Sequence, residues 1–247
     1  MTLEQFFKEV PRAALAFSGG TDSALLLWAA KTYGCDVRAY YVNTVFQPAF
    51  ELADAQKLAK ELEVPMTVVE ADVLAVPEAA VNGPRRCYYC KKALFSTLWK
   101  RAAEDGYTVL LDGTNASDDA GDRPGMQALR ELEVRSPLRE CGITKDQVRQ
   151  MSKEAGLFTW DKPAYACLAT RVPTGTAITR EALEKVERGE DALFKLGFTD
   201  FRVRLLGDAA RIQLPEAQME RAVQLHDTIA KALERDFSAV LLDLKGR

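Results

Sequence analysis

The sequence predicts an α/β fold with a parallel sheet, followed by a smaller α+β domain. In the first half of the 247 residues, short apolar runs alternate with helical patterns, which is typical of a parallel sheet with helices on both faces. After this region the order changes to helix, two strands, helix and strand, which indicates a small α+β domain. We therefore expect domains at 1–158 and 159–247.

The elements of the first domain follow from hydrophobic periodicity. Four apolar runs predict its strands: 12–17, 37–42, 66–70 and 107–111. Three helical patterns separate them: 21–33, 48–63 and 90–104. Residues 118–145 are rich in loop signals, and a helix at 144–155 precedes a Pro-punctuated stretch at 160–176. This region is interpreted as the connection between the domains.

In the second domain the predicted elements are a helix at 179–196, strands at 201–206 and 209–214, a helix at 216–235 and a strand at 238–243. Alternation along the first strand places Phe201, Val203 and Leu205 toward the core and Arg202 and Arg204 on the other face. Two guanidiniums on one face suit a phosphate or paired carboxylates, although a solvated polar face is the commoner outcome. Arg211 can join this group across a hairpin at Gly207-Asp208. Three acids of the preceding helix can partner the arginines or a cation on the ligand: Glu187, Glu190 and Asp191.

Composition and charge limit the possible functions. No run of eighteen apolar residues is present, so no transmembrane span is expected, and the mixed, charged N-terminus is not typical of a signal peptide. A net charge of −3 and a pI of about 5.5 give no long-range reason to expect a nucleic-acid partner. Five cysteines, an odd count without a secretory signal, favour a reducing cytoplasm. The single histidine, His226, is interpreted as a surface or packing residue.

The strongest local signal lies directly after the first strand, in the sequence Ser18-Gly19-Gly20-Thr21-Asp22-Ser23. A strand that ends in a Gly-Gly turn and opens into a helix leaves backbone N–H groups and the positive end of the helix dipole for an anion. The Walker Lys-Ser/Thr pair and the Rossmann glycine spacing are both missing. The segment 112–115 follows the last strand of the sheet and should lie on the same rim. A turn that binds nothing is the alternative.

The cysteines are the second set of candidate reactive or metal-binding residues. Cys87 and Cys90 form a C-x-x-C, which can be a redox pair, half a zinc site, part of an iron–sulfur site or a chance spacing. Cys167 stands four residues before Arg171 and is either a reactive thiol or a buried small hydrophobe. Cys35 is interpreted as packing, and the role of Cys141 stays open. Three thiolates with one open position would suit a cluster that must bind something else.

The chain resembles a known family along nearly its whole length. The hexapeptide is a signature of the PP-loop ATP pyrophosphatases, and the further motifs in order resemble the LarE family of sulfur transferases, which help to build the nickel-pincer nucleotide cofactor. The motifs are Ser18–Ser23, Asp112-Gly-Thr-Asn115, Arg123-Pro-Gly125, Ser136-Pro-Leu138, Trp160-Asp-Lys-Pro163, Ala166-Cys-Leu-Ala-Thr-Arg171, Gly197-Phe and Phe201-Arg-Val-Arg204. The resemblance implies a reaction: ATP adenylates a carboxylate of pyridinium-3,5-biscarboxylic acid mononucleotide, sulfur displaces AMP, and a thiocarboxylate results.

The resemblance also implies roles for individual residues. Residues Ser18 to Ser23 would bind the ATP phosphates, with Asp22 near Mg²⁺, and the nucleotide site would include Ala16, Phe17, Asn43, Gly113 and Asn115. Cys167 matches the sulfur-donating cysteine of one branch. Five residues match positions around the substrate: Thr170, where we would expect Ser, Arg171, Glu190, Arg202 and Arg204.

Two branches of the family differ in their sulfur source. In one, a single cysteine is sacrificed and becomes dehydroalanine. In the other, three cysteines hold a [4Fe-4S] cluster whose fourth iron carries a sulfide. The set Cys87, Cys90 and Cys167 implies the cluster branch. We expect a cytoplasmic homo-oligomer that needs ATP, Mg²⁺, the cluster and sulfide or another sulfur donor. Alternative functions are sacrifice of Cys167, a ligase or amidotransferase, tRNA thiolation and a nucleotide-sensing module.

Overall fold

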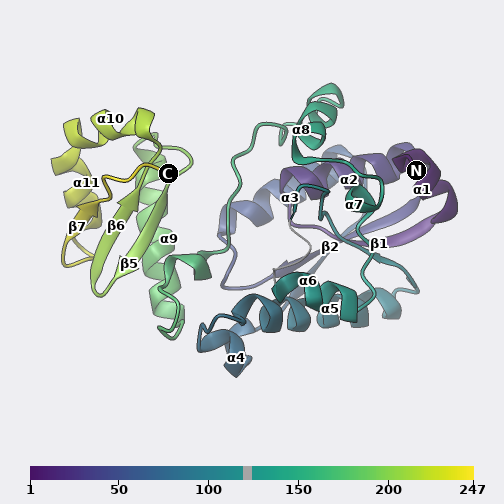
Figure 1. The fold of residues 1–247 in the computed structure, drawn as a ribbon, viewed down its shortest axis with the longest axis horizontal. Helices are drawn as coiled ribbons and strands as arrows, with labels where there is room; N and C mark the ends of the chain where they lie inside the picture. Colours follow the sequence, from purple (N-terminus) through teal and green to yellow (C-terminus); the bar gives the residue numbers. More distant parts are fainter. Residues whose placement is uncertain (119–123) are drawn as a thin grey trace. The chain divides into compact units, whose positions relative to one another are not determined.

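The computed structural model describes residues 1–118 and 124–247 (Figure 1). Arg123, the first residue of one motif, lies outside the described residues. The chain divides into two compact units, each made of two segments. Unit 1 contains residues 1–76 and 85–162, and unit 2 contains residues 77–84 and 163–247.

Unit 1 is built on a parallel sheet of four strands in the order β3-β2-β1-β4. The strands are β1 (Arg12–Ala16), β2 (Asp36–Asn43), β3 (Met66–Glu70) and β4 (Leu110–Leu111). This confirms the predicted parallel α/β fold. The last strand is shorter than the predicted 107–111, because the backbone N–H of Tyr107 donates to the carbonyl of Ala102 and so belongs to the end of the preceding helix.

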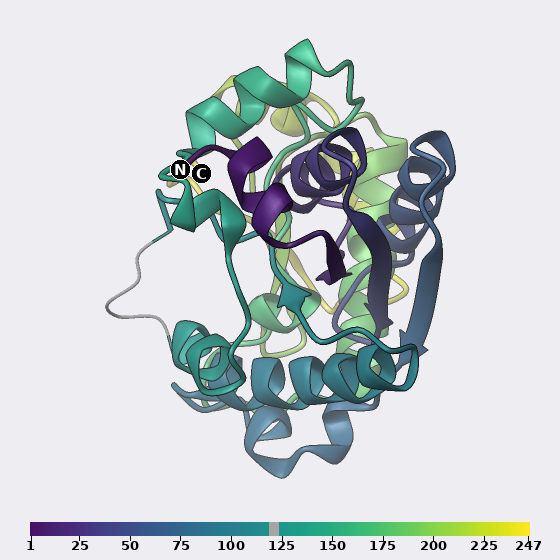
Figure 2. The same ribbon diagram turned by 90° about the vertical axis from the view of Figure 1, so that its right-hand side faces the viewer.

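Helices cover both faces of this sheet, as Figures 1 and 2 show. On one face Leu15 and Tyr41 pack in a core with α1 (Leu3–Glu9), α2 (Thr21–Thr32) and α3 (Ala49–Glu61). On the other face Ala14 and Tyr40 pack against α5 (Arg86–Glu104). Successive residues of one strand therefore enter two different cores, which is why the central strands are apolar throughout. η1 (Val73–Ala75) follows β3.

The segment predicted as loop-rich contains two helices, α6 (Pro124–Glu131) and α7 (Pro137–Glu140), before α8 (Lys145–Glu154). The prolines that suggested loops stand at the first position of each helix, where a missing N–H breaks no intrahelical bond. α6 packs on α5, where the indole N–H of Trp99 donates to the carbonyl of Leu132 over 2.7 Å. The segment is thus part of unit 1.

Unit 2 contains a three-stranded mixed sheet, β5-β6-β7, with β5 and β6 antiparallel and β7 parallel to β6. Its elements after residue 163 are η2 (Leu168–Arg171), α9 (Arg180–Lys195), β5 (Arg202–Leu206), β6 (Ala209–Gln213), η3 (Glu216–Gln218), α10 (Met219–Gln224), α11 (His226–Leu233) and β7 (Val240–Leu242). The hairpin at Gly207-Asp208 is confirmed. The helix predicted at 216–235 is interrupted at Leu225, which lies between α10 and α11. Close to this break, the ring of His226 forms a hydrogen bond with the carbonyl of Val223.

A short segment from the first half of the chain, residues 77–84 with α4 (Pro77–Ala80), packs within unit 2. The side-chain amide of Asn82, which is 1% exposed, donates to the carbonyls of Val172, Pro173 and Thr176 over 2.9 to 3.3 Å. The backbone N–H of Ile178 donates to Ala80 over 2.7 Å. The chain therefore passes between the units three times. None of the described helices is long and apolar enough to cross a membrane.

Candidate nucleotide and substrate sites

The loop Ser18–Ser23 joins the carboxyl end of β1 to α2, as predicted. Gly20 is the N-cap residue and supplies no side chain to the first turn of the helix. The loop is internally braced, because the hydroxyls of Ser18 and Ser23 lie 3.1 Å apart and the Gly20 N–H donates to Ser18 Oγ over 3.3 Å. Backbone donors at a helix N-terminus favour a phosphate at this position.

Two glycines allow close packing around this loop. Gly19 has a φ of +72°, and a Cβ there would lie 3.0 Å from the Cβ of Ala55 on α3. At Gly113 a Cβ would lie 2.9 Å from the backbone nitrogen of Ser23. Side chains at either position would displace the loop or its neighbours. Gly113, predicted from the sequence to share this rim, thus lies directly against the start of α2.

The carboxylate of Asp22 connects the loop to two other segments. Its Oδ1 accepts from the side-chain amide of Asn115 over 3.1 Å, and its Oδ2 lies 2.6 Å from the Nζ of Lys145. Sequence reasoning expected Asp22 and Asn115 in the site but missed Lys145, which is 123 positions away. The only local signal was the start of a helix, because a lysine in a first turn has no motif of its own.

An apolar cavity of about 120 Å³ adjoins the loop. Ala16 at the end of β1 lines it together with Phe17 and Ser18, which follow that strand, and Leu94 and Phe95 line it from α5. An apolar cavity beside a phosphate loop suits the flat ring of a nucleobase. Asn43 ends β2 on the same rim, where its amide donates to Glu70 over 3.0 Å.

The cysteines occupy different environments. Cys87 lies in the first turn of α5 and is exposed, with a guanidinium nitrogen of Arg86 3.7 Å from its sulfur. Cys90 follows at the start of the second turn and is half-buried. Cys87 also lines a cavity of about 280 Å³ together with Thr114, so the C-x-x-C adjoins the 112–115 rim.

Cys167 is the N-cap residue of η2 in unit 2 and is half-buried. Its carbonyl accepts from both the N–H and the hydroxyl of Thr170, over 3.0 and 2.9 Å. In the described chain none of the five cysteines forms a disulfide, and no three His, Cys, Asp or Glu side chains gather as a metal site. The predicted cluster ligands therefore come from both units, two from unit 1 and one from unit 2.

The thiols of the other two cysteines, Cys35 and Cys141, are in less reactive environments. Burial, and then the nearby Asp36 carboxylate, raise the pKa of the Cys35 thiol to about 11. Burial also raises the pKa of the Cys141 thiol. At neutral pH both sulfurs are protonated and weakly nucleophilic. Cys35 is buried, as predicted, and its side chain packs in the core of unit 1.

The five residues that match substrate positions come together in unit 2. Arg171 and Glu190, each 1% exposed, form a bidentate ion pair with N–O distances of 2.7 and 3.1 Å. Glu190 also accepts from the N–H of Val203 over 2.9 Å and from the hydroxyl of Tyr165. This buried carboxylate therefore joins the loop before η2, helix α9 and strand β5.

The arginine side chains of β5 are more buried than the alternation along the strand predicted. Phe201 and Val203 are in the core as expected, but Arg202 is also buried, at 4% exposed. Its guanidinium donates to the carbonyls of Ala164 and Phe201 over 2.6 Å each. The guanidinium of Arg204 donates to the carbonyl of Thr170. The solvated face that alternation allowed is thus covered by the loop that carries Cys167.

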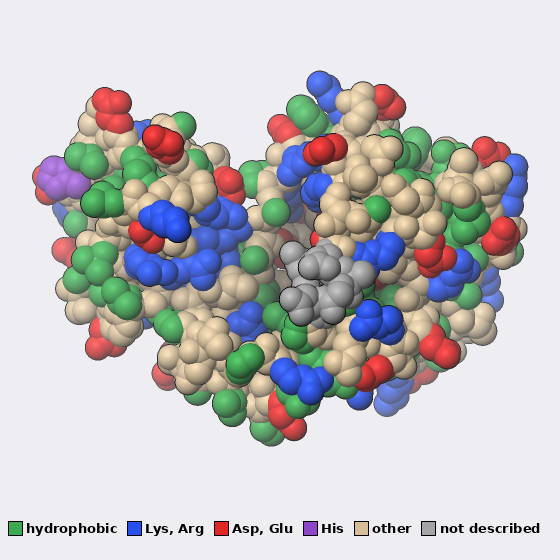
Figure 3. Space-filling view, viewed as in Figure 1, with side chains coloured by type: hydrophobic (Ala, Val, Ile, Leu, Met, Phe, Trp, Pro, Cys, Tyr) green, Lys and Arg blue, Asp and Glu red, His purple; other side chains and the backbone are tan. Residues whose placement is uncertain are grey.

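Positive charge exceeds negative charge around this cluster. Burial, and then the charges of Arg171 and Arg247, lower the pKa of Arg202 to about 10. Burial, followed by Arg171, Arg211 and Arg247, lowers the pKa of Arg204. Three of these five guanidiniums pair with carboxylates, while Arg202 and Arg204 donate to backbone and amide oxygens. Figure 3 shows Lys and Arg side chains gathered on one face of this unit. The arrangement suits a multiply charged anion.

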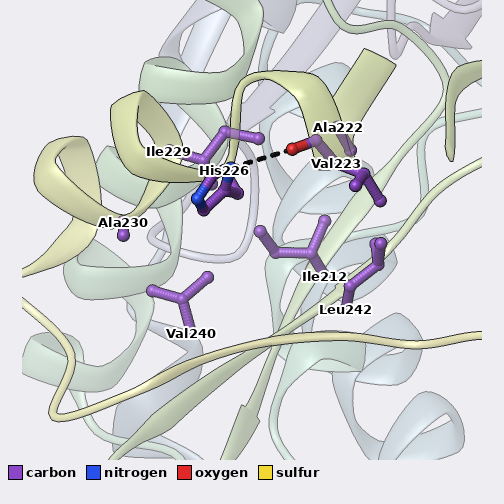
Figure 4. A pocket seen from close by; sticks show the side chains of 8 residues that line it. All are labelled: Ile212, Ala222, Val223, His226, Ile229, Ala230, Val240 and Leu242. Carbon is purple, nitrogen blue, oxygen red and sulfur yellow. Dashed lines mark hydrogen bonds between the residues drawn. The ribbon is translucent and has the colours of Figure 1, made fainter. Parts of the chain in front are cut away.

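A separate groove in unit 2 has a different character. It measures about 310 Å³ and is lined by apolar side chains of β6, β7, α10 and α11, with His226 at its edge (Figure 4). The Nδ1–H of His226 donates to the carbonyl of Val223 over 2.9 Å, and the side chain is 73% exposed. His226 is thus a surface residue, as predicted, and shares no contact with the arginine cluster among the described interactions.

Comparison with known proteins gives one match to part of the chain and others to nearly all of it. The family described as Queuosine biosynthesis protein QueC matches residues 12–81, which include the loop. A protein of Synechocystis sp. without an assigned function is 40% identical over 99% of this chain and 92% of its own. Pyridinium-3,5-bisthiocarboxylic acid mononucleotide synthase of Lactiplantibacillus plantarum is 36% identical over 99% of this chain and 90% of its own. A tRNA-specific 2-thiouridylase of Clostridium botulinum is 24% identical over 71% of this chain and 60% of its own.

Proposed function

The chain belongs to the LarE family of PP-loop ATP pyrophosphatases, and on that premise we propose that it is an ATP-dependent sulfur transferase acting on pyridinium-3,5-biscarboxylic acid mononucleotide. The product would be the bisthiocarboxylate used for the nickel-pincer nucleotide cofactor. One observation carries the proposal: similarity to the Lactiplantibacillus synthase extends over 99% of the chain and so includes both units. The relation to the tRNA thiouridylase covers a smaller share, and the net charge of −3 does not favour tRNA.

The first step we propose is adenylation. A carboxylate oxygen of the substrate attacks the α-phosphorus of ATP, and pyrophosphate leaves with the electron pair of the broken P–O bond. The backbone N–H groups at the start of α2 bind the phosphates and stabilise the charge that develops on pyrophosphate. Asp22 fits a Mg²⁺ ligand, because Mg²⁺ prefers oxygen donors and is usually held by one or two carboxylates with substrate phosphates.

Substrate binding is assigned to the arginine cluster. Arg202 and Arg204 can bind the phosphate or a carboxylate of the mononucleotide, because their guanidiniums have no carboxylate in their described hydrogen bonds. Arg171 and Glu190 hold strand β5 and the loop of Cys167 in place around them. The hydroxyl of Thr170, at the position where the resemblance led us to expect Ser, keeps a donor beside the backbone of Cys167.

The second step is sulfur transfer. A sulfur nucleophile adds to the carbonyl carbon of the acyl adenylate, and AMP leaves, which gives the thiocarboxylate. Repetition at the second carboxylate completes the reaction. The donor set Cys87, Cys90 and Cys167 fits a [4Fe-4S] cluster in number and chemistry, although its third thiol comes from unit 2. When bound, such a cluster would present the reactive sulfide at its open iron site.

The proposal is tested by product analysis under anaerobic conditions. Protein reconstituted with iron and sulfide should convert the mononucleotide to a thiocarboxylate, with one AMP and one pyrophosphate per sulfur, detected by mass spectrometry. Absence of any sulfur-containing product in the presence of ATP, Mg²⁺ and sulfide would overturn it. Iron and acid-labile sulfide should be bound by the wild type and lost in Cys87→Ala.

Cysteine sacrifice is the competing sulfur source and has its own signature. If Cys167 supplies the sulfur, one turnover lowers the protein mass by one hydrogen sulfide, and Cys87→Ala stays fully active. If a cluster supplies it, the mass of the polypeptide does not change and Cys87→Ala is inactive.

A further inference from the structure

Lys145 is the first residue of α8, and its side chain reaches the phosphate loop from a distant part of the chain. Its Nζ lies 2.6 Å from Asp22 Oδ2, and the lysine and aspartate side chains are 31% and 26% exposed. We propose that Lys145 is a further phosphate-binding residue of the nucleotide site, which moves from Asp22 to an ATP phosphate oxygen when nucleotide binds. The inference rests on the ATP-binding part of the proposed function.

The backbone around Lys145 is held in place before any ligand arrives. Its N–H donates to Ser117 Oγ over 3.0 Å, and the N–H of Ala116 donates to the carbonyl of Ile143 over 2.8 Å. Thr144 caps α8 in a capping box with Gln147. These bonds attach the start of α8 to the loop after β4, which also supplies Asn115. A residue fixed in this way positions its ammonium at little entropic cost.

The acidic residue of the loop favours a cation at this place. Asp22 is the charged residue of the Ser18–Ser23 loop, and its carboxylate would repel the phosphates that the loop binds. A Lys ammonium has three N–H donors on a flexible stem, so it can turn from a carboxylate to a phosphate oxygen. If a metal ion takes the Asp22 carboxylate, the ammonium is left to bind the anionic phosphates that the loop would hold. The pair is therefore suited to exchange partners when nucleotide and metal bind.

The competing explanation is purely structural, with the ion pair only fastening α8 to α2. Half-exposed ion pairs contribute little to stability, so its loss by itself should leave the fold unchanged. The two explanations differ in what they predict for nucleotides that lack phosphates. A phosphate contact affects only ligands that carry a polyphosphate, whereas a displaced loop affects adenosine as well.

The test uses the full chain and the non-cleavable analogue α,β-methylene ATP with Mg²⁺, and measures binding by isothermal titration calorimetry. Lys145→Met should weaken analogue binding about ten- to hundredfold, the usual effect of losing a charged hydrogen bond. Adenosine binding, measured by equilibrium dialysis, should change less than about twofold. Lys145→Arg should restore most of the affinity because the charge is kept.

A matched control is Lys8→Met, which removes the same side chain from an exposed pair with Glu4 that is 2.7 Å long and lies on α1. It should bind the analogue like the wild type. The inference is overturned if Lys145→Met binds the analogue as tightly as the wild type, or if it loses adenosine and the analogue equally. If the wild type binds the analogue but forms no thiocarboxylate, the proposed function fails and this inference stands.

Discussion

The two units carry candidate anion sites that are built in opposite ways. In unit 1 the Ser18–Ser23 loop offers backbone N–H groups at a helix N-terminus, and its one charged residue is an acid. In unit 2 the site is made of guanidiniums, two of them close to a buried carboxylate hub at Glu190. A backbone site depends on the path of the chain and on small residues. A side-chain site depends on charges whose burial must be compensated.

Because one site is made of backbone and the other of side chains, we expect them to respond differently to substitutions. The loop should be sensitive to any added atom near its backbone and insensitive to the loss of a side-chain hydroxyl. The arginine cluster should be sensitive to the loss of one charge and less so to changes of shape. The following substitutions test this comparison, from the largest expected effect to the smallest.

Glu190→Ala should destabilise unit 2 the most, because it leaves Arg171 buried without its carboxylate partner. Removing one member of a buried ion pair typically costs about 3–5 kcal/mol. Urea denaturation followed by circular dichroism measures the change. The control is Arg188→Met on the same helix, whose pair with Asp236 is half-exposed on the arginine side and should cost about 1 kcal/mol or less. Equal losses of stability in both variants would show that the buried contacts of Glu190 contribute no more than a surface ion pair.

Gly113→Ala should damage the backbone site without removing any polar group. Its Cβ would lie 2.9 Å from the nitrogen of Ser23, and that nitrogen belongs to a helix backbone that cannot move alone. We expect a loss of about 1–3 kcal/mol in stability, as for other overpacked sites, together with weaker binding of α,β-methylene ATP. Gly83→Ala, where nothing lies within 4 Å of the added atom, is the matched control. Normal nucleotide binding by Gly113→Ala would contradict the close packing described for the loop.

Arg204→Met should separate the two sites by ligand. Affinity for the pyridinium mononucleotide should fall about tenfold, because one charged hydrogen-bond donor to an anion is lost. Affinity for α,β-methylene ATP should not change, since Arg204 belongs to unit 2. Both are measured by calorimetry. A loss of nucleotide binding alone would reverse the assignment of the two units.

Thr21→Val should have the smallest effect. It removes a buried hydrogen bond of 2.9 Å from the Thr21 hydroxyl to the carbonyl of Thr159 but keeps the shape of the side chain. A stability loss of about 1 kcal/mol is expected in thermal denaturation. Nucleotide affinity should stay within about twofold, because the backbone carries the contacts. A large loss of affinity would mean that the loop binds through its side chains after all.

The same comparison explains what could be predicted from the sequence. The loop is contiguous, so its six residues and the strand before them could be recognised together. The hairpin at Gly207-Asp208 and the pairing of Arg204 with Arg211 also followed from local alternation. Glu190 was predicted to join the arginines, but its contacts with Arg171, Tyr165 and the N–H of Val203 could not be predicted, because only tertiary packing brings these segments together. Burial of Arg202 was missed for the same reason, since the covering loop begins 38 residues earlier.

Other differences between the predicted and the observed elements arise because one local signal can indicate two structures. Pro124 and Pro137 suggested loops, yet each begins a helix, because the first turn has no need of the missing N–H. Lys145 had no motif at all and is recognisable only through its contact with Asp22. The assignment of residues 77–84 to unit 2 depends on the amide of Asn82, whose φ of +59° and three carbonyl partners belong to the folded chain.

The placement of residues 77–84 has a consequence for how this protein can be divided or recombined. A fragment that ends near residue 158 carries α4 and Asn82 but lacks the carbonyls of residues 172–176 that they bind. The complementary fragment lacks the segment that fills that place. Exchange of unit 2 between related proteins therefore requires three cuts and two grafted segments, one for residues 77–84 and one for residues 163–247. Unit 2 is thus not one continuous stretch of the chain, because eight of its residues, 77–84, come from the first half of the sequence.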